Sequence, residues 1–166
     1  MAEAKTKYVK DSQITMIELV LPNDTNMLNN LLGGRLMHWM DIAAAMSAAK
    51  HCNSVAVTAS VDDLAFHHPI RLGNIVTLKT SVNRAFNTSM EVGVRVEVED
   101  FETGVVLHSN SAYFTFVSID RASGAKMHVP PVVAETGEEN RRFEQALQRR
   151  EQRLKSKHGI IHHDKP

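Results

Sequence analysis

One segment of the chain combines amide, glycine and carboxylate residues in an order that could hydrolyse an acyl derivative. Asn30 precedes the pair Gly33–Gly34, and Asp41 follows that pair by about two helical turns. A helix that begins at the glycines exposes unpaired N–H groups, which stabilise the oxyanion formed when a thioester or ester carbonyl is attacked. A carboxylate such as Asp41 can activate water or attack directly. The alternative is structural, with a tight turn at the glycines and a buried, ion-paired aspartate.

Other residues that could carry chemistry have simpler explanations. The His67–His68 pair could supply a general base, although histidines that precede a proline at a strand end are more often structural. Cys52 is the only cysteine, which excludes a disulfide within the chain and is consistent with a reducing compartment. Its simpler role is that of a small buried residue. His162–His163 has no third metal ligand nearby, and the sequence contains no Walker A loop, nucleophile elbow, zinc-binding or dinucleotide motif. We therefore predict no metal site.

The composition is that of an ordinary globular protein. The 166 residues are 43% hydrophobic and 23% charged, which fits one domain with a sizeable core and excludes a disordered or collagen-like chain. The 19 basic residues balance 19 acidic ones, which argues against a nucleic-acid partner. The sequence has neither the apolar segment of a signal peptide nor a run long enough to span a membrane. We expect a soluble cytoplasmic protein with no membrane insertion.

The elements that must position the candidate residues form an α+β pattern. The run from Arg35 to about His51 has helical spacing and many alanines, which predicts a thin, buried helix wrapped closely by a sheet. Strands are predicted at residues 14–21, 55–66, 75–85, 90–98 and 105–119. Because short turns join the last three, we predict an antiparallel meander.

The charged C-terminal region predicts a helical extension to this domain. Residues 138–157 contain seven basic and four acidic residues, a pattern typical of a solvated surface helix, although its basic end could attract an acidic partner. We divide the chain into a domain at residues 12–133, a C-terminal helical extension at 134–157 and a disordered tail at 158–166.

The order of short motifs along the chain resembles the hot-dog-fold acyl-CoA thioesterases, most closely those of the cytosolic acyl-CoA hydrolase type. The resemblance extends over roughly residues 12–135. The motifs that carry it are Asp24–Asn26, Asn30–Gly34, Trp39–Asp41, His51–Ser54, Phe66–Gly73, Asn87–Val92 and Val129–Val132. It implies a hot-dog fold, in which a curved antiparallel sheet wraps a long central helix. It also implies a homo-oligomer: two copies join side by side into one sheet, and three such dimers often form a hexamer.

The family places its active sites between the two helices of a dimer, and three residues of this chain match its motifs. The resemblance implies that Asp41 is the catalytic carboxylate, either as general base or as nucleophile. Asn30 is implied to be the amide that works with it, from the other subunit, and Gly34 the glycine whose N–H polarises the thioester carbonyl. Residues 27–29 and Leu32 depart from the histidine or glycine that many members carry there, which bears on the acyl pocket.

Coenzyme A carries phosphates, so cationic and hydroxyl groups should surround the mouth of its binding site. The candidates, for each of which ordinary surface or turn chemistry is the alternative, are Arg71, Arg84, Asn87, Thr88, Ser89 and Arg121.

The sequence thus predicts an acyl-CoA thioesterase that needs an acyl-CoA substrate and a second copy of itself, but no metal or organic cofactor. A hot-dog dehydratase is one alternative, although those relatives typically use a histidine base where this helix offers Asp41. A non-catalytic acyl-CoA sensor is another, weakened because only 13 residues precede the first predicted strand.

Overall fold

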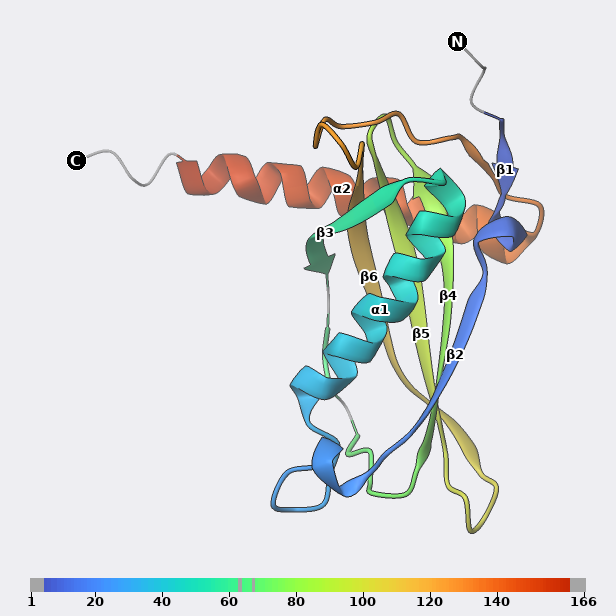
Figure 1. Cartoon of the computed structure of the whole chain (residues 1–166), viewed down its shortest axis with the longest axis vertical. Coiled ribbons are helices and arrows are strands. Elements are labelled where there is room, and N and C mark those ends of the chain that lie inside the picture. The colour runs from blue at the N-terminus through green and yellow to red at the C-terminus, as the bar shows by residue number, and fades with distance from the viewer. Residues whose placement is uncertain (1–4, 63, 67, 162–166) are drawn as a thin grey trace.

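A five-stranded antiparallel sheet curls around one long helix, α1 (Gly33–Cys52) (Figure 1). This computed structural model describes residues 5–62, 64–66 and 68–161, with side chains described as far as residue 156. The strands lie in the order β2 (Ile14–Leu19), β4 (Ile75–Ala85), β5 (Ser89–Glu99), β6 (Val106–Ile119) and β3 (Val55–Asp62). The α+β class, the hot-dog architecture and the β4–β5–β6 meander predicted from the sequence are confirmed.

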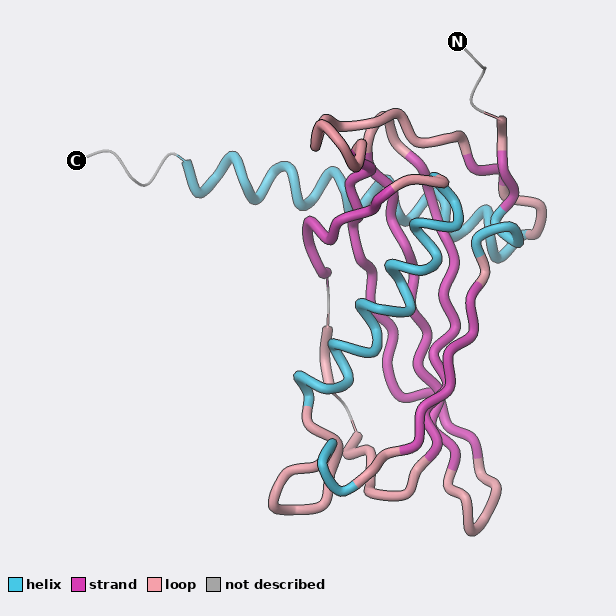
Figure 2. The backbone as a smooth tube through the Cα atoms, viewed as in Figure 1, coloured by secondary structure: helices cyan, strands magenta, loops and turns pink. Residues whose placement is uncertain are grey.

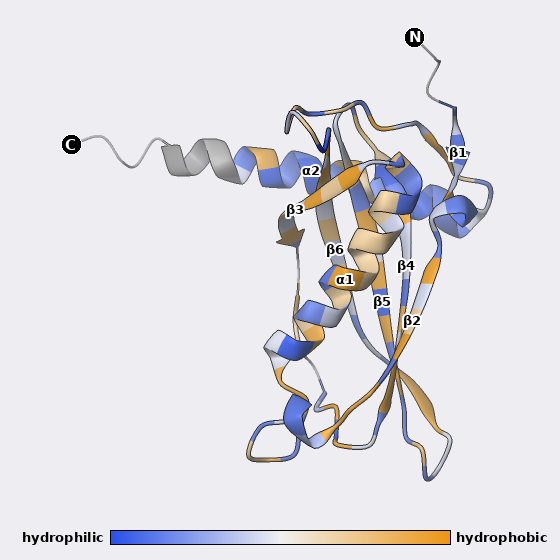
Figure 3. Cartoon of the chain, in the orientation of Figure 1, coloured by the Kyte–Doolittle hydropathy of each residue, from blue (hydrophilic) through white to orange (hydrophobic). Residues whose placement is uncertain are grey.

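Helix α1 is wrapped closely because its side chains are small. Met40, Ala43, Ala44 and Ala48 are fully buried against the sheet, and Figure 3 shows the helix as largely apolar in its second half. The helix ends at Asn53, which adopts the left-handed conformation (φ 52°) and whose N–H donates to the Ala49 carbonyl. Small side chains allow the backbone of the sheet to approach.

The alternation predicted for residues 90–98 gives β5 one face toward α1 and one away from it. Val92, Val94 and Val96 are buried toward the helix, whereas Glu91 and Arg95 lie on the opposite, outer face. Register shifts interrupt the ladders after Val82 in β4, at Ser109 in β6 and after Thr58 in β3. Such bulges bend strands, which is how a flat ladder becomes a sheet that curls around a helix.

The structure contains a second, two-stranded sheet that was not predicted from the sequence. β1 (Lys7–Tyr8) pairs in parallel with β7 (Val132–Val133), beside the 3-10 turn η1 (Val9–Ser12) (Figure 2). These strands have two residues each, too few for a periodic pattern to show. The pairing attaches residues 7–8, which precede the predicted boundary at residue 12, to the domain. A further 3-10 turn, η2 (Pro22–Asp24), follows β2.

The C-terminal helix α2 (Gly137–Ile161) crosses the outer face of the sheet, on the side away from α1 (Figure 1). It continues four residues beyond the predicted end at residue 157, so residues 158–161 of the predicted tail are helical, and 162–166 lie outside the described residues. Within the described part of the chain, no helix is both long and apolar enough to cross a membrane.

Candidate active site

A carboxylate on α1 and a hydroxyl on β3 form a direct hydrogen bond. The Thr58 hydroxyl donates to Asp41 Oδ1 over 2.6 Å. Asp41 is half-buried in the middle of the helix, and Thr58 lies at the bulge of the edge strand β3. The bond fixes one carboxylate oxygen and leaves Oδ2 without a partner among the described residues, which suits a carboxylate that must act on water or on a carbonyl carbon.

The first turn of α1 supplies hydrogen-bond donors. Helix geometry leaves the N–H groups of Gly33 and Gly34 unpaired, and neither donates to any described residue. A Cβ on Gly33 would lie 3.2 Å from the ring of Phe66, whereas a Cβ on Gly34 would meet nothing within 4 Å. Gly33 therefore gives room to a neighbouring ring, and the Gly34 N–H is open to a ligand.

An apolar pocket adjoins these donors. It has a volume of about 330 Å³ and lies between the start of α1 and the segment that follows β3. Its lining residues are Leu31, Gly33, Leu36, Phe66, His68, Pro69 and Ile70. An alkyl chain attached to a carbonyl at Gly34 would find apolar surface here.

The loop before α1 is held by its own polar groups, which fixes the position of the helix start. Asp24, 7% exposed, forms an ion pair with Arg35 at 3.0 Å and accepts the N–H of Leu21. Asn26 Oδ1 accepts the N–H groups of Leu28 and Asn30 at 2.9 and 3.2 Å. The Asn26 amide nitrogen has no partner among the described residues, so it remains available as a donor.

Asn30 and Arg71 lie together near the start of α1. Their backbones form an isolated antiparallel bridge, and the Arg71 N–H donates to Asn74 Oδ1 at 2.8 Å. The Asn30 side-chain amide is half-buried and has no hydrogen-bond partner within the described part of the chain. The structure therefore brings Asn30, Arg71 and Gly34 to the same end of the helix.

Asp41, however, is remote from that end of its own chain. Seven residues separate it from Gly34, which corresponds to about 10 Å along the helix axis. A catalytic carboxylate and an oxyanion donor must both lie about 3 Å from the reacting group. One copy of the chain cannot satisfy both distances around a single carbonyl.

The other residues predicted to bind coenzyme A lie toward the opposite end of α1. Asn87, Thr88 and Ser89 form the turn between β4 and β5, where Asn87 Oδ1 is 3.0 Å from His128 Nδ1. Arg121 is exposed in the loop after β6. Met90, which follows this turn, pairs with Phe116 on β6, and Phe116 pairs with Thr58 on β3. The turn therefore lies two strands, or about 10 Å, from Thr58.

Arg84, which was also predicted to bind coenzyme A, contacts the C-terminal helix α2. Its guanidinium lies 4.0 Å from the centre of the Phe143 ring and donates to the Phe143 carbonyl at 3.1 Å. It also lies 3.8 Å from Glu144. Arg84 is thus half-buried between β4 and α2, where it attaches the C-terminal helix to the sheet rather than facing solvent.

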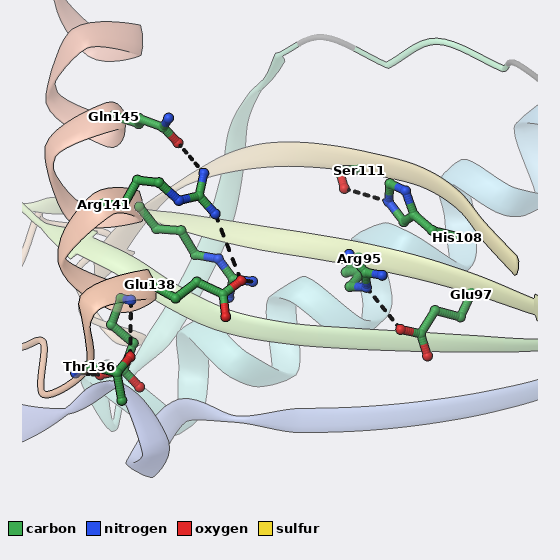
Figure 4. Close-up of polar contacts among 10 residues, drawn as sticks. Arg95, Glu97, His108, Ser111, Thr136, Glu138, Arg141 and Gln145 are labelled. Carbon is green, nitrogen blue, oxygen red and sulfur yellow. Dashed lines mark hydrogen bonds and ion pairs between the residues drawn. The ribbon is translucent and has the colours of Figure 1, made fainter.

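A larger, polar groove of about 480 Å³ lies on the outer face of the sheet beside α2. Figure 4 shows Arg95 and Glu97 on one side and Glu138 and Arg141 on the other. Hydrogen bonds from Lys79 and then Arg95 lower the pKa of Glu97, at 2.7 and 2.9 Å. The cations that line this groove are already paired with Glu138 or with the neighbouring Glu97, and the sheet separates the groove from Asp41.

The remaining histidine and cysteine candidates form no second catalytic or metal site among the described residues. His67 and His162–His163 lie outside the described residues. Cys52 is half-buried and accepts a hydrogen bond from the Ser54 hydroxyl at 3.2 Å. Among the described residues, no three histidine, cysteine, aspartate or glutamate side chains are grouped to hold a metal ion.

Comparison with known proteins assigns this architecture to a family. Residues 28–105 match the thioesterase superfamily. YkhA of Bacillus subtilis (strain 168), described as an uncharacterized acyl-CoA thioester hydrolase, is 38% identical over 157 residues, which span 95% of this chain and 91% of that protein. The chain belongs to the thioesterase superfamily.

Solved structures of superfamily proteins support the same assignment. An acyl-CoA hydrolase from Staphylococcus aureus, in complex with butyryl coenzyme A and coenzyme A, is 33% identical with a TM-score of 0.85, covering 95% of this chain and 98% of that one. A hexameric acyl-CoA thioesterase is 38% identical with a TM-score of 0.88, covering 92% and 97%.

The Staphylococcus aureus hydrolase has also been solved with single alanine replacements of an asparagine, an aspartate and a threonine. In that protein the aspartate follows the asparagine by 15 positions and precedes the threonine by 17. Asn26, Asp41 and Thr58 of this chain have the same two intervals. Thr58 is not among the site residues predicted from the sequence, because a threonine in a strand carries no local signal of a partner on the helix.

Proposed function

We propose that this superfamily member is an acyl-CoA thioesterase, which hydrolyses acyl-CoA to free coenzyme A and a carboxylic acid. The hydrogen bond between Thr58 and Asp41, at 2.6 Å, is the observation that carries this proposal, since it orients a carboxylate beside an open face of the helix. The hydrolase and thioesterase activities of similar proteins support it.

In the proposed reaction, Asp41 works on the thioester carbonyl with the help of donors at a helix start. Acting as a general base, its carboxylate takes a proton from water as the water oxygen attacks the carbonyl carbon. The developing oxyanion accepts a hydrogen bond from the Gly34 N–H. The carbon–sulfur bond then breaks, and the thiolate takes up a proton to leave as coenzyme A. Direct attack by Asp41, through an anhydride that water hydrolyses, uses the same geometry.

The distance between Asp41 and Gly34 requires that the site be formed by two copies. Helix α1 also exposes apolar side chains on both margins of its outward side, where Met37, Ile42 and Met46 are each about two-fifths exposed. The same side of the molecule carries β3, an edge strand with unpaired backbone groups. Pairing of β3 with its copy would extend the sheet and place the start of one α1 near Asp41 of the other. A trimer of such dimers is consistent with the hexameric similar structures.

Two asparagines compete for the role of the assisting amide. Asn30 has a free, half-buried side chain, but Asn26 shares the spacing of the asparagine replaced in the Staphylococcus aureus hydrolase. In addition, Asn26 has its oxygen fixed by two backbone N–H groups, so its NH₂ is presented in one orientation. On these grounds we propose Asn26 as the principal amide donor and Asn30 as a neighbour of the acyl group.

The predicted contacts to coenzyme A divide between the two copies. Arg71 accompanies Gly34 in one copy, while Asn87, Thr88 and Ser89 accompany Thr58 of the other. We propose that these groups surround the phosphates and pantetheine arm and that Arg84 takes no part. We further propose that the enzyme needs no metal or organic cofactor, binds no nucleic acid and is located in the cytoplasm.

A thiol-release assay over a series of acyl-CoA chain lengths tests the proposal. Asp41→Asn should lower kcat by roughly 10²- to 10⁴-fold, the range of a general acid–base contribution, with an unchanged circular dichroism spectrum. Asn26→Ala should reduce turnover more than Asn30→Ala. Near-normal turnover of Asp41→Asn would exclude the mechanism, and tight binding of coenzyme A without hydrolysis of any acyl chain would favour a sensor.

A further inference from the structure

Helix α2 crosses the strands of the sheet one after another and then passes its edge. Phe143 lies against Arg84 of β4, Arg149 contacts Glu91 of β5 and Tyr113 of β6, and Arg153 pairs with Asp62 of β3. Ten residues of helix, about 15 Å, thus cover three strand spacings of about 4.8 Å each. Because β3 is the last strand, the remainder of α2 projects beyond the sheet, as Figure 1 shows.

The position of this crossing is set by a buried ion pair. The Arg149 guanidinium donates to both oxygens of Glu91 at 2.7 and 3.0 Å, and Glu91 is fully buried. Burial would lower the pKa of Arg149, but its hydrogen bonds to Glu91 raise it. The same guanidinium lies 3.5 Å from the centre of the Tyr113 ring. Since these contacts hold the helix in register with the strands, the part beyond Arg153 cannot fold back over the sheet of its own chain.

We name residues 154–161 the α2 overhang. These eight residues extend about 12 Å past Arg153, which is the width of two to three strands. In the dimer proposed above, the space beyond β3 is occupied by β3 of the second copy. We propose that the α2 overhang of each copy docks on the outer face of the partner's sheet, across the β3–β3 junction; this inference rests on the proposed dimer.

The outer face of β3 carries an apolar patch at the place where the overhang of a second copy would arrive. Val55 and Val57 are 37% and 41% exposed, and they share the face of Asp62 because their cross-strand partners on β6 lie on one side. A two-fold axis through the middle of β3 brings the Asp62 end of one strand beside the Val55 end of the other. The overhang that passes Asp62 in one copy therefore covers Val55 and Val57 in the next.

The two ends of β3 offer different partners to helix α2: a carboxylate, Asp62, at one end and apolar side chains, Val55 and Val57, at the other. The Asp62 end is taken by Arg153 of the same chain, which leaves only the valine end of β3 open on this face. Covering the valines removes exposed apolar surface, which favours association. The structure thus assigns the C-terminal helix a reciprocal contact between two copies of this chain.

Disulfide trapping in the full-length chain tests the contact. In a Cys52→Ser background, Val57→Cys and Ser156→Cys are introduced together. Within one chain these two cysteines cannot form a disulfide. Helix α2 passes over Asp62, and the cross-strand pair of Val57 lies about 13 Å along the strands from the pair of Asp62. A disulfide requires Cα atoms within about 7 Å. Oxidation, or a short bifunctional maleimide, should therefore shift the protein from the monomer to the dimer band on a non-reducing gel.

Matched controls separate this contact from chance collisions. One control combines Lys79→Cys with Ser156→Cys, so that the first thiol lies on the outer face three strands from the edge strand β3. This variant and each single-cysteine variant should stay monomeric on the gel. Sedimentation and thiol-release activity are measured on the same samples. An uncrosslinked protein that still sediments as a dimer or a hexamer and hydrolyses acyl-CoA would overturn the helix contact but leave the proposed function. A crosslinked dimer that does not hydrolyse acyl-CoA would overturn the proposed function but support the helix contact. A protein that sediments as a monomer would overturn the helix contact.

Discussion

Removal of the Thr58 hydroxyl tests whether Asp41 must be held by β3 in order to act. Thr58→Val keeps the shape of the side chain but deletes the donor to Asp41 Oδ1. The bond is 2.6 Å long and has a carboxylate as acceptor, and hydrogen bonds to charged groups contribute about 1.5 to 3 kcal/mol. If this stabilisation is needed in the transition state, kcat should fall by about 10- to 160-fold.

The control is Thr58→Ser, which retains the hydroxyl at the same position. Thiol release is followed with one acyl-CoA at saturating and limiting concentrations, so that kcat and KM are separated. We expect Thr58→Ser to stay close to the unmodified protein, and KM of Thr58→Val to change little, because Thr58 positions the carboxylate and does not bind the acyl chain. Equal loss in both variants would show that the strand position and not the hydroxyl matters, and full activity of Thr58→Val would refute the reasoning.

Two further predictions concern stability. Burial lowers the pKa of His51, whose one hydrogen bond to the described residues joins Nε2 to the Pro130 carbonyl at 2.8 Å. The folded protein therefore holds His51 neutral and should lose stability as pH falls below about 6.5, where the unfolded chain takes up a proton. The difference in Tm between pH 7.5 and 5.5 should shrink in His51→Gln; an unchanged difference would exclude His51 as its source. Arg149→Leu should lower the free energy of unfolding in urea by about 3 to 5 kcal/mol, because the buried Glu91 carboxylate loses its counter-ion and keeps only the hydrogen bond from the Asn83 amide among the described residues. Adding Glu91→Gln should restore part of the lost free energy of unfolding. No restoration would mean that Arg149 stabilises the protein only through packing on Tyr113.

Long periodic segments made most of the fold predictable. The valines of β5 alternate over a whole strand, and α1 contains a run of small residues without proline or glycine, so the pattern repeats often enough to identify each element. β1 and β7, with two residues each, have no such pattern and exist only because the chain brings them together. The predicted end of the C-terminal extension, residue 157, precedes the end of α2 at Ile161, because a charged helix has no apolar periodicity to mark its last turns.

The position of the candidate site residues on α1 could be predicted because those residues are local in sequence. Glycines before a helix and a carboxylate two turns later lie within one segment, so their placement on α1 followed from the residue types alone. Whether they act remains a prediction. Thr58 could not be found in this way, because its relation to Asp41 depends on how a strand 17 residues further on packs against the helix.

The sequence by itself determined a neutral α+β chain with one buried helix and the residue types for acyl hydrolysis. Tertiary structure decided which of those residues meet. It attached Arg84 to α2 through Phe143, joined Asp41 to Thr58, and left Gly34 about 10 Å from Asp41 along the helix axis. The physical reason is that periodicity records only which face of an element is buried, whereas the partner of a polar side chain is set by strand order and register. The same geometry makes one copy of the chain insufficient for the proposed reaction.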